Sequence, residues 1–130
     1  MTRPVPLRLL VALLALVAAA SNAPAAEAPD PSVLVGTWQV DLRPTPDAEP
    51  YFQTFVVTAA GADTLAGSFY GTEIGEGRIN TDWGALHLAF VTGDGSGAYN
   101  TSAVLDGDVL RGTTHSLGRD FLAVWTARRQ

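Results

Sequence analysis

The 130-residue chain contains no cysteine. Small exported domains commonly depend on disulfide bonds, so an exported domain without cysteine must be held together by packing and strand pairing alone. The same absence excludes the attachment of a lipid anchor to a signal-peptide cysteine. The stability of the folded part must therefore come from its core and its backbone hydrogen bonds.

Positive charge is also scarce. The chain has eight basic residues, all arginine, against thirteen acidic ones. Arg3 and Arg8 lie near the N-terminus, so the rest of the chain carries six basic residues and a net charge near −7. Nucleic acids and anionic lipid surfaces both require a basic patch. We therefore expect no nucleic-acid partner, and an acidic surface mainly favours solubility.

No apolar run is long enough for a lasting transmembrane helix, which needs roughly twenty residues. The longest, residues 9–20, follows Arg3 and Arg8 and precedes the small residues of "SNAPAA". A basic front, a short apolar centre and a small-residue end form the layout of a secretory signal peptide. We predict a signal peptide over residues 1–26 with cleavage near Ala26, a secreted or periplasmic protein, and no stable membrane insertion after its removal.

The remaining residues suffice for one domain. Residues 27–32, "EAPDPS", are rich in proline and are expected to form a flexible lead-in. Residues 33–130 number about a hundred, enough for a single modest core. We therefore predict one domain over this range.

Short β-prone runs separated by turn residues occupy the predicted domain, and glycine interrupts nearly every helical window. Asp106-Gly107 between two such runs is a strong hairpin signal. Closure of successive hairpins removes both exposed edges, so we predict an all-β, eight-stranded antiparallel up-and-down β-barrel. A sandwich of two sheets is the alternative, but only residues 43–50 form a long loop. The eight runs are 33–42, 51–59, 64–70, 72–79, 83–92, 98–105, 109–116 and 121–128.

The first run contains Gly36-Thr37-Trp38, and the last ends in Arg128-Arg129. A G-x-W on the first strand of a small exported barrel resembles the calycin superfamily, which includes lipocalins, avidins and bacterial metalloprotease inhibitors. The chain also resembles small, mostly uncharacterised lipocalin-like exported bacterial domains, and the resemblance spans roughly residues 34–129. It implies that Trp38 closes one barrel end, together with Gly36, and that Arg128 or Arg129 lies across the indole.

Residues 54–69, "TFVVTAAGADTLAGSF", are similar to the second and third strands of avidins. The avidin biotin site does not carry over. Val40 stands where avidins have an asparagine, and Phe69 stands where they have a tyrosine. We therefore do not expect biotin binding.

Patterns typical of catalysis or metal binding are weak. His87 and His115 have no third ligand at a suitable spacing, so we expect no metal and no cofactor. His115, Ser116 and Asp120 contain the residue types of a hydrolase triad, yet no nucleophile elbow is present. Asp94 and its neighbours lack the spacing of a calcium loop and are typical hairpin formers. We therefore do not expect an enzyme.

Aromatic residues recur along the runs, and inward-facing ones would either line a pocket or fill the barrel. Our first hypothesis is a protein that binds a small hydrophobic or aromatic ligand. The alternative is a protein-interaction module such as a protease inhibitor, with a filled barrel as scaffold and residues 27–32 as the inserted segment. The candidate ligand-binding residues are Tyr70, Trp83, Tyr99, His115 and Trp125.

Overall fold

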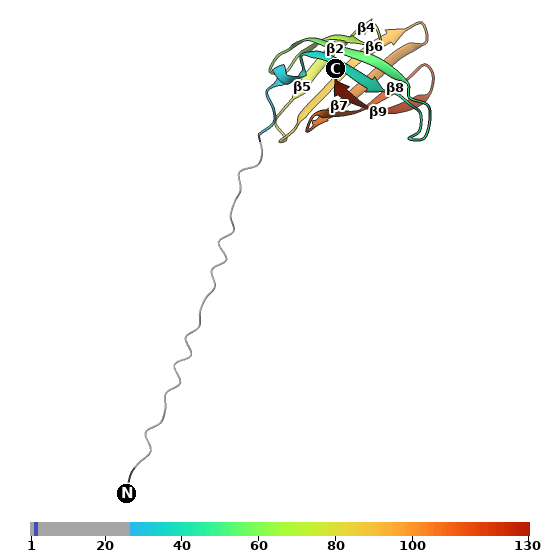
Figure 1. Ribbon diagram of the computed structural model, residues 1–130. Helices are drawn as coiled ribbons and strands as arrows, with labels where there is room; N and C mark the ends of the chain where they lie inside the picture. The colour runs from blue at the N-terminus through green and yellow to red at the C-terminus, as the bar shows by residue number, and fades with distance from the viewer. Residues whose placement is uncertain (1, 3–26) are drawn as a thin grey trace.

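The computed structural model describes Thr2 and residues 27–130, so the predicted signal peptide lies outside the described residues apart from Thr2. The described part contains one short 3-10 helix, nine β-strands and no α-helix (Figure 1). An all-β fold is therefore confirmed. The elements are η1 (Pro31–Leu34), β1 (Gly36–Asp41), β2 (Phe52–Ala60), β3 (Leu65–Phe69), β4 (Thr72–Glu73), β5 (Gly75–Asn80), β6 (Leu86–Asp94), β7 (Gly97–Asp106), β8 (Val109–Ser116) and β9 (Phe121–Arg129).

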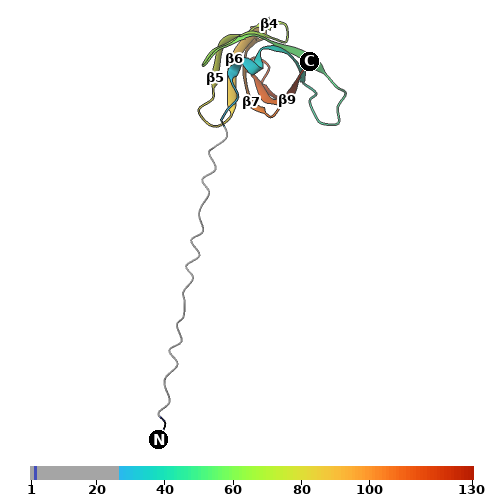
Figure 2. The same ribbon diagram turned by 60° about the vertical axis from the view of Figure 1, so that its left-hand side comes forward.

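All nine strands belong to one antiparallel sheet with the order β4-β3-β2-β1-β9-β8-β7-β6-β5. Successive strands are paired except β4 and β5, and β1 also pairs with β9, which brings the two ends of the domain together. Figure 2 shows the strands curving around a common interior. The predicted antiparallel barrel is thus confirmed in its coarse form, and the two-sheet alternative is wrong.

The strands at the two ends of the sheet, β4 and β5, are consecutive in the chain and separated only by Ile74. The N–H of Ile74 donates to the carbonyl of Gly67 on β3 at 3.0 Å. An isolated bridge between Thr64 and Arg78 also joins the two ends. These few contacts bring the edges of the sheet together, so the barrel is nearly closed.

The expected strand over residues 72–79 is divided in the structure, and the strand count is nine in the described residues rather than eight. β4 pairs with β3, whereas β5 pairs with β6. Ile74 lies between them with its side chain buried. A Cβ on Gly77 would lie 2.1 Å from the carbonyl oxygen of Leu65, so only glycine permits this approach. The chain bends here because it crosses from one edge of the sheet to the other.

Inward and outward side chains alternate along the strands, as a half-buried strand requires. On β6, Leu86, Leu88 and Phe90 are buried, whereas His87 and Ala89 are exposed. The same alternation on the other strands produces one continuous core.

Aromatic rings fill the middle of the barrel. The rings of Phe55, Phe69, Phe90 and Trp125 pack with centroids 5.3–5.6 Å apart. Tilted and edge contacts at such distances add stability beyond area burial. The centre of the barrel is therefore occupied by its own side chains.

The polar groups beside this cluster are satisfied internally. The indole N–H of Trp125 donates to Oγ1 of Thr114 at 3.0 Å. That hydroxyl also lies 2.9 Å from Oγ1 of Thr101. Since buried polar groups are costly when unpaired, this chain of bonds fixes the indole in one orientation.

One end of the barrel is closed by η1 and Trp38. The carboxylate of Asp30 caps η1 by accepting from the N–H of Ser32 at 2.9 Å. The indole N–H of Trp38 donates to the carbonyl of Leu34 at 2.8 Å, and both side chains are buried. Pro31–Leu34 thus form a helical turn, and the first strand begins at Gly36 rather than at residue 33.

The arginine that covers Trp38 is Arg129. Trp38 and Arg129 are paired directly across β1 and β9, and the guanidinium carbon lies 4.6 Å from the centroid of the Trp38 ring. Its Nη1 donates to the carbonyl of Val35 at 2.9 Å, and a Cβ on Gly36 would lie 2.8 Å from that nitrogen. Arg128 lies 3.9 Å from the exposed Asp108, so of the two expected arginines it is Arg129 that contacts Trp38.

Candidate functional site

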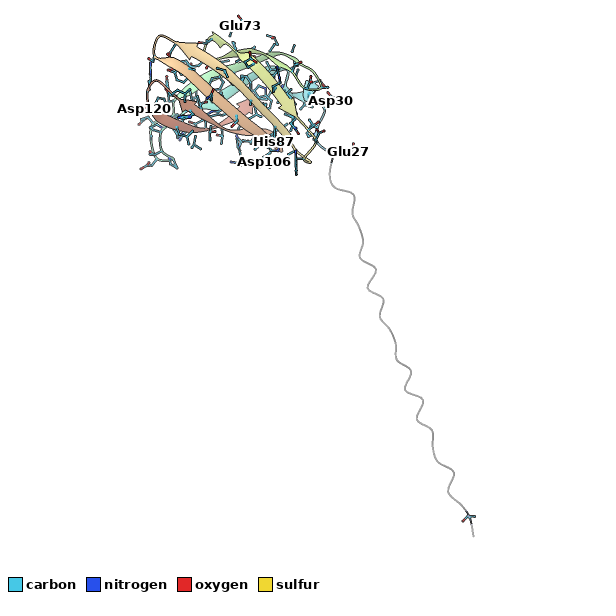
Figure 3. The ribbon with its side chains drawn as sticks, turned by 180° about the vertical axis from the view of Figure 1, so that it is seen from behind. Glu27, Asp30, Glu73, His87, Asp106 and Asp120 are labelled. Atoms are coloured by element: carbon cyan, nitrogen blue, oxygen red, sulfur yellow. The ribbon has the colours of Figure 1, made fainter. Side chains whose placement is uncertain are left out.

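The end of the barrel opposite η1 is open, and its rim consists of turns. Because the strands are antiparallel and follow one another, alternate connections lie at the same end. The connections after β1, β3, β6 and β8 meet at this end. Figure 3 shows the two ends, with Asp120 from the β8–β9 connection on one side of the barrel and Asp30 on the other.

A pocket of about 400 Å³ opens between these turns. Its walls are largely aromatic, because Tyr51, Tyr70, Tyr99 and Phe121 all line it. Phe69, a member of the central aromatic cluster, lines it as well. The pocket is therefore confined to the mouth of the barrel, above a filled interior. Its volume lies in the lower part of the range of small-molecule sites, roughly 300–1,000 Å³.

Tyr51 and Tyr70 form a pair on one side of the mouth. Their ring centroids are 6.2 Å apart in an edge-to-face arrangement. Their hydroxyl oxygens are hydrogen-bonded to each other. Because each tyrosine is held by the other, two half-exposed rings present a fixed apolar wall to the pocket.

Tyr70 occupies an unusual backbone position. It forms the turn between β3 and β4 with Gly71, and their φ angles are +55° and +77°. A two-residue turn with both φ angles positive favours Asn or Asp followed by Gly. Tyrosine in the left-handed region costs roughly 1–2 kcal/mol. A strained residue whose side chain lines a pocket is a candidate for function rather than stability.

Asp94 organises the opposite side of the mouth. Its Oδ1 accepts from the N–H of Ser96 at 2.7 Å, and its Oδ2 accepts from the hydroxyl of Tyr99 at 2.7 Å. Nη2 of Arg119 lies 3.9 Å from the same Oδ2, and Nε of Arg119 donates to Oγ of Ser96 at 3.2 Å. One carboxylate thus positions both a tyrosine and an arginine at the rim.

These contacts shift the pKa values of Asp94 and Tyr99. The hydrogen bond from Tyr99, followed by that from the Ser96 backbone, lowers the pKa of Asp94 below its ordinary value. The same hydrogen bond raises the pKa of Tyr99. At neutral pH, Asp94 is therefore ionised and Tyr99 is neutral. A carboxylate with a lowered pKa is a poor general base, so this cluster is better suited to binding than to proton transfer.

Gly118 brings the β8–β9 connection against the β6–β7 turn. A Cβ on Gly118 would lie 1.5 Å from the carbonyl oxygen of Ser96, so no other residue fits without movement of the backbone. The N–H of the next residue, Arg119, donates to Oγ of Ser116 at 3.2 Å. The close backbone contact therefore holds Arg119 beside Asp94.

The five predicted ligand-binding residues are not all brought together. Tyr70 and Tyr99 line the pocket. Trp125 is buried in the central cluster beneath it. Trp83 is 84 % exposed in the connection before β6, which begins only at Leu86, and it does not line the pocket.

His115 also lies away from the pocket. Its neighbours on β8, Thr114 and Ser116, are buried, so alternation turns His115 to the outer face of the barrel. His115 is therefore not brought together with Tyr70 and Tyr99. The other histidine, His87, is also on the outer face, on β6. Within residues 27–130, no group of three or more metal-ligating side chains is close enough to hold an ion.

Most of the pocket lining lies outside the predicted ligand-binding residues. Tyr51 and Phe121 begin the predicted runs 51–59 and 121–128, whereas Asp94 and Arg119 stand at predicted turns. The signal that would have found them is the alternation of turns between the two barrel ends. Every second connection of an up-and-down barrel belongs to the same mouth.

In comparisons with known proteins, no family model, no curated protein and no solved structure matches this chain. Among the described residues, no helix is long and apolar enough to cross a membrane.

Proposed function

We propose that this protein binds a small apolar or aromatic molecule in the pocket at the open end of its barrel. The observation that carries the proposal is the pocket of about 400 Å³ walled by Tyr51, Tyr70, Tyr99 and Phe121. Sites of this kind combine apolar walls with a few convergent polar groups. Asp94 and Arg119 supply such groups at the rim.

The filled interior limits how deep in the barrel a ligand can bind. Phe69 and Trp125 pack against each other at 5.5 Å below the pocket, which leaves the ligand at the mouth rather than deep in the barrel. Tyr70 and Tyr99 are proposed to contact it, whereas Trp125 supports the floor from below. The strained backbone of Tyr70 supports this assignment, because a turn selected for stability alone would favour asparagine or glycine there.

The fold family and the export of the protein are part of the same proposal. β4 and β5 are proposed to be two halves of one bent strand, which gives the eight strand positions of a lipocalin-like barrel. Trp38 under Arg129 at one end supports the resemblance to the calycin superfamily. A signal peptide over residues 1–26 would deliver the barrel to the periplasm or the medium.

A protein partner is the alternative, and one observation favours it. Leu122 and Val124 on the outer face of β9 are 60 % and 69 % exposed. Neighbouring apolar side chains on a strand surface are typical of an interaction site. Residues 27–32 are less suited to insertion into a protease cleft, because Pro31 and Ser32 belong to η1, whose Leu34 is buried.

Calorimetric titration with apolar and aromatic compounds tests the proposal, alongside native mass spectrometry of the protein purified from its own host. Ala123 lines the pocket, so Ala123→Trp should fill it and abolish binding. Ala89 is exposed on the outer face of β6, so Ala89→Trp is the matched control and should bind as the wild type does. Circular dichroism establishes that both variants fold.

Binding that is lost in Ala123→Trp and retained in Ala89→Trp would support the proposal. A clean apo mass together with no binding by any compound would overturn it. Binding that survives Ala123→Trp would place the ligand elsewhere and would also overturn it.

A further inference from the structure

The mouth of the barrel contains two charged side chains, Asp94 and Arg119, whose capacities for further hydrogen bonds differ. Asp94 accepts from the N–H of Ser96 and from the hydroxyl of Tyr99, and Arg119 lies 3.9 Å away. Each oxygen of Asp94 therefore already accepts one hydrogen bond from the protein, about half of what a carboxylate can accept.

Arg119 uses a smaller part of its hydrogen-bonding capacity. A guanidinium has five N–H donors, and only the Nε–H of Arg119 makes a hydrogen bond, to Oγ of Ser96 at 3.2 Å. Among the hydrogen bonds of residues 27–130, none uses its Nη groups, and the 3.9 Å to Asp94 is too long for one. The guanidinium is thus held in place at one edge while its other donors remain available. Such a fork suits bidentate recognition of a carboxylate.

Arg119 and the tyrosine pair lie on different sides of the same pocket. In the order of strands, β2 and β1 lie between the β3–β4 hairpin, whose turn carries Tyr70, and the β8–β9 hairpin, whose connection carries Arg119. Both residues line the pocket, as does Phe121. A ligand that fills the mouth would therefore meet aromatic rings at one end and guanidinium donors at the other.

We propose that the ligand is an aromatic carboxylate, with its ring against Tyr51, Tyr70 and Phe121 and its carboxylate on the Nη groups of Arg119. This inference rests on the proposed function and names the ligand class for the same pocket. Asp94 then acts as a positioning residue, because it holds Arg119 without contacting the ligand. Since the chain outside residues 1–26 has a net charge near −7, the preference must come from Arg119 locally and not from the overall field.

A matched ligand series tests the class. Naphthylacetate, naphthylacetamide and naphthylethylamine share one aromatic body and carry a negative, a neutral and a positive end. Each is titrated by calorimetry into the wild type, into Arg119→Gln and into Arg111→Gln. Arg111 is the matched control, because its side chain is 58 % exposed against 56 % for Arg119 and also pairs with an aspartate, on the outer face of the barrel.

We expect the wild type and Arg111→Gln to bind naphthylacetate about tenfold more tightly than the amide, the ratio that one charge-assisted hydrogen bond provides. In Arg119→Gln the ratio should fall to near one while the affinity for the amide stays unchanged. An unchanged affinity for the amide would show that Arg119→Gln leaves the pocket intact. The lost preference for the carboxylate would then come from the missing guanidinium and not from a displaced loop.

Equal binding of the carboxylate and the amide by the wild type would overturn the inferred class and leave the proposed pocket standing. Tightest binding of the amine would also overturn it, and would assign recognition to Asp94. If none of the three compounds binds, the class is overturned, and the titrations with Ala123→Trp decide the proposed function separately.

Discussion

The guanidinium of Arg129 lies over the indole of Trp38 with 4.6 Å between the guanidinium carbon and the ring centroid. The two residues are direct partners across β1 and β9, the first and last strands of the barrel. Arg129 also donates to the carbonyls of Val33 and Val35, in and just after η1. A single arginine thus joins the helical turn, the first strand and the last strand, and it fixes the closed end.

The buried tryptophan of this end is expected to dominate its stability. Trp38→Ala should lower the free energy of unfolding by about 3–5 kcal/mol, the range for truncation of a large buried side chain. Trp83→Ala is the control, because Trp83 is 84 % exposed and its removal should change stability by less than about 0.5 kcal/mol. Chemical denaturation of both variants measures the difference. Equal free energies of unfolding for the two variants would contradict the assignment of Trp38 to the core of the closed end.

Arg128 and Arg129 are adjacent in sequence but have different surroundings. Arg129→Gln removes the contact with Trp38 and two bonds to backbone carbonyls, so it should cost about 1 kcal/mol or more. Arg128→Gln removes only a long, exposed contact to Asp108 and should be neutral. Thermal unfolding at low and high salt compares them. A larger effect of Arg128→Gln would refute the assignment of Arg129 to the closed end.

The backbone contact at Gly118 is expected to set the position of Arg119. Gly118→Ala places a Cβ where the carbonyl oxygen of Ser96 lies, so the loop must move, at a cost of about 1–3 kcal/mol. Gly95→Ala is the matched control, since no atom lies within 4 Å of its added Cβ. Amide hydrogen exchange in residues 94–99 should increase only in Gly118→Ala. Unchanged exchange in both variants would mean that the loop tolerates the methyl group.

The left-handed backbone of Tyr70 can be separated from the role of its ring. Tyr70→Asn and Tyr70→Val both remove the ring, but only asparagine is well suited to a φ of +55°. The asparagine variant should therefore be about 1–2 kcal/mol more stable than the valine variant. Both variants should bind the pocket ligand more weakly than the wild type. Equal stability of the two would show that the turn relaxes when the ring is lost.

The pKa of Tyr99 provides a spectroscopic test of the rim. Its hydrogen bond to Asp94 raises the pKa above the ordinary value of 10.0 by stabilising the neutral phenol. While Asp94 is ionised, the stability that this bond contributes through Tyr99 is present below pH 10.0 and is lost as pH rises through the raised pKa. Asp94→Asn should lower the pKa of Tyr99 toward its ordinary value. Ultraviolet titration of tyrosinate measures this, with Tyr99→Phe to assign the signal.

Much of the fold follows from local sequence patterns. Alternating apolar residues such as Leu86, Leu88 and Phe90 indicate a half-buried strand because successive side chains of a strand point to opposite faces. Asp106-Gly107 indicates a hairpin because glycine supplies the positive φ that the turn requires. These features depend on residues close together in the chain, so the sequence alone determines them.

The bend between β4 and β5 cannot be predicted from such local patterns. The backbone of Gly77 approaches the carbonyl of Leu65, twelve residues earlier in the chain, and this contact determines where the strand divides. From sequence the run over residues 72–79 is only a weak strand with two glycines. The reason for those glycines is visible only when the edges of the sheet meet.

The sequence by itself determined an all-β chain of hairpins and the alternation of side chains along strands such as β6, whereas the choice of Arg129 over Arg128 beside Trp38 came from the structure. Only the tertiary structure decided which residues line the pocket. Two of them, Tyr51 and Phe121, are seventy residues apart in the chain. The tertiary structure also directed Trp83 and His115 to solvent. The physical reason is that strand periodicity is a local property, whereas the mouth depends on strand order, register and turn length together.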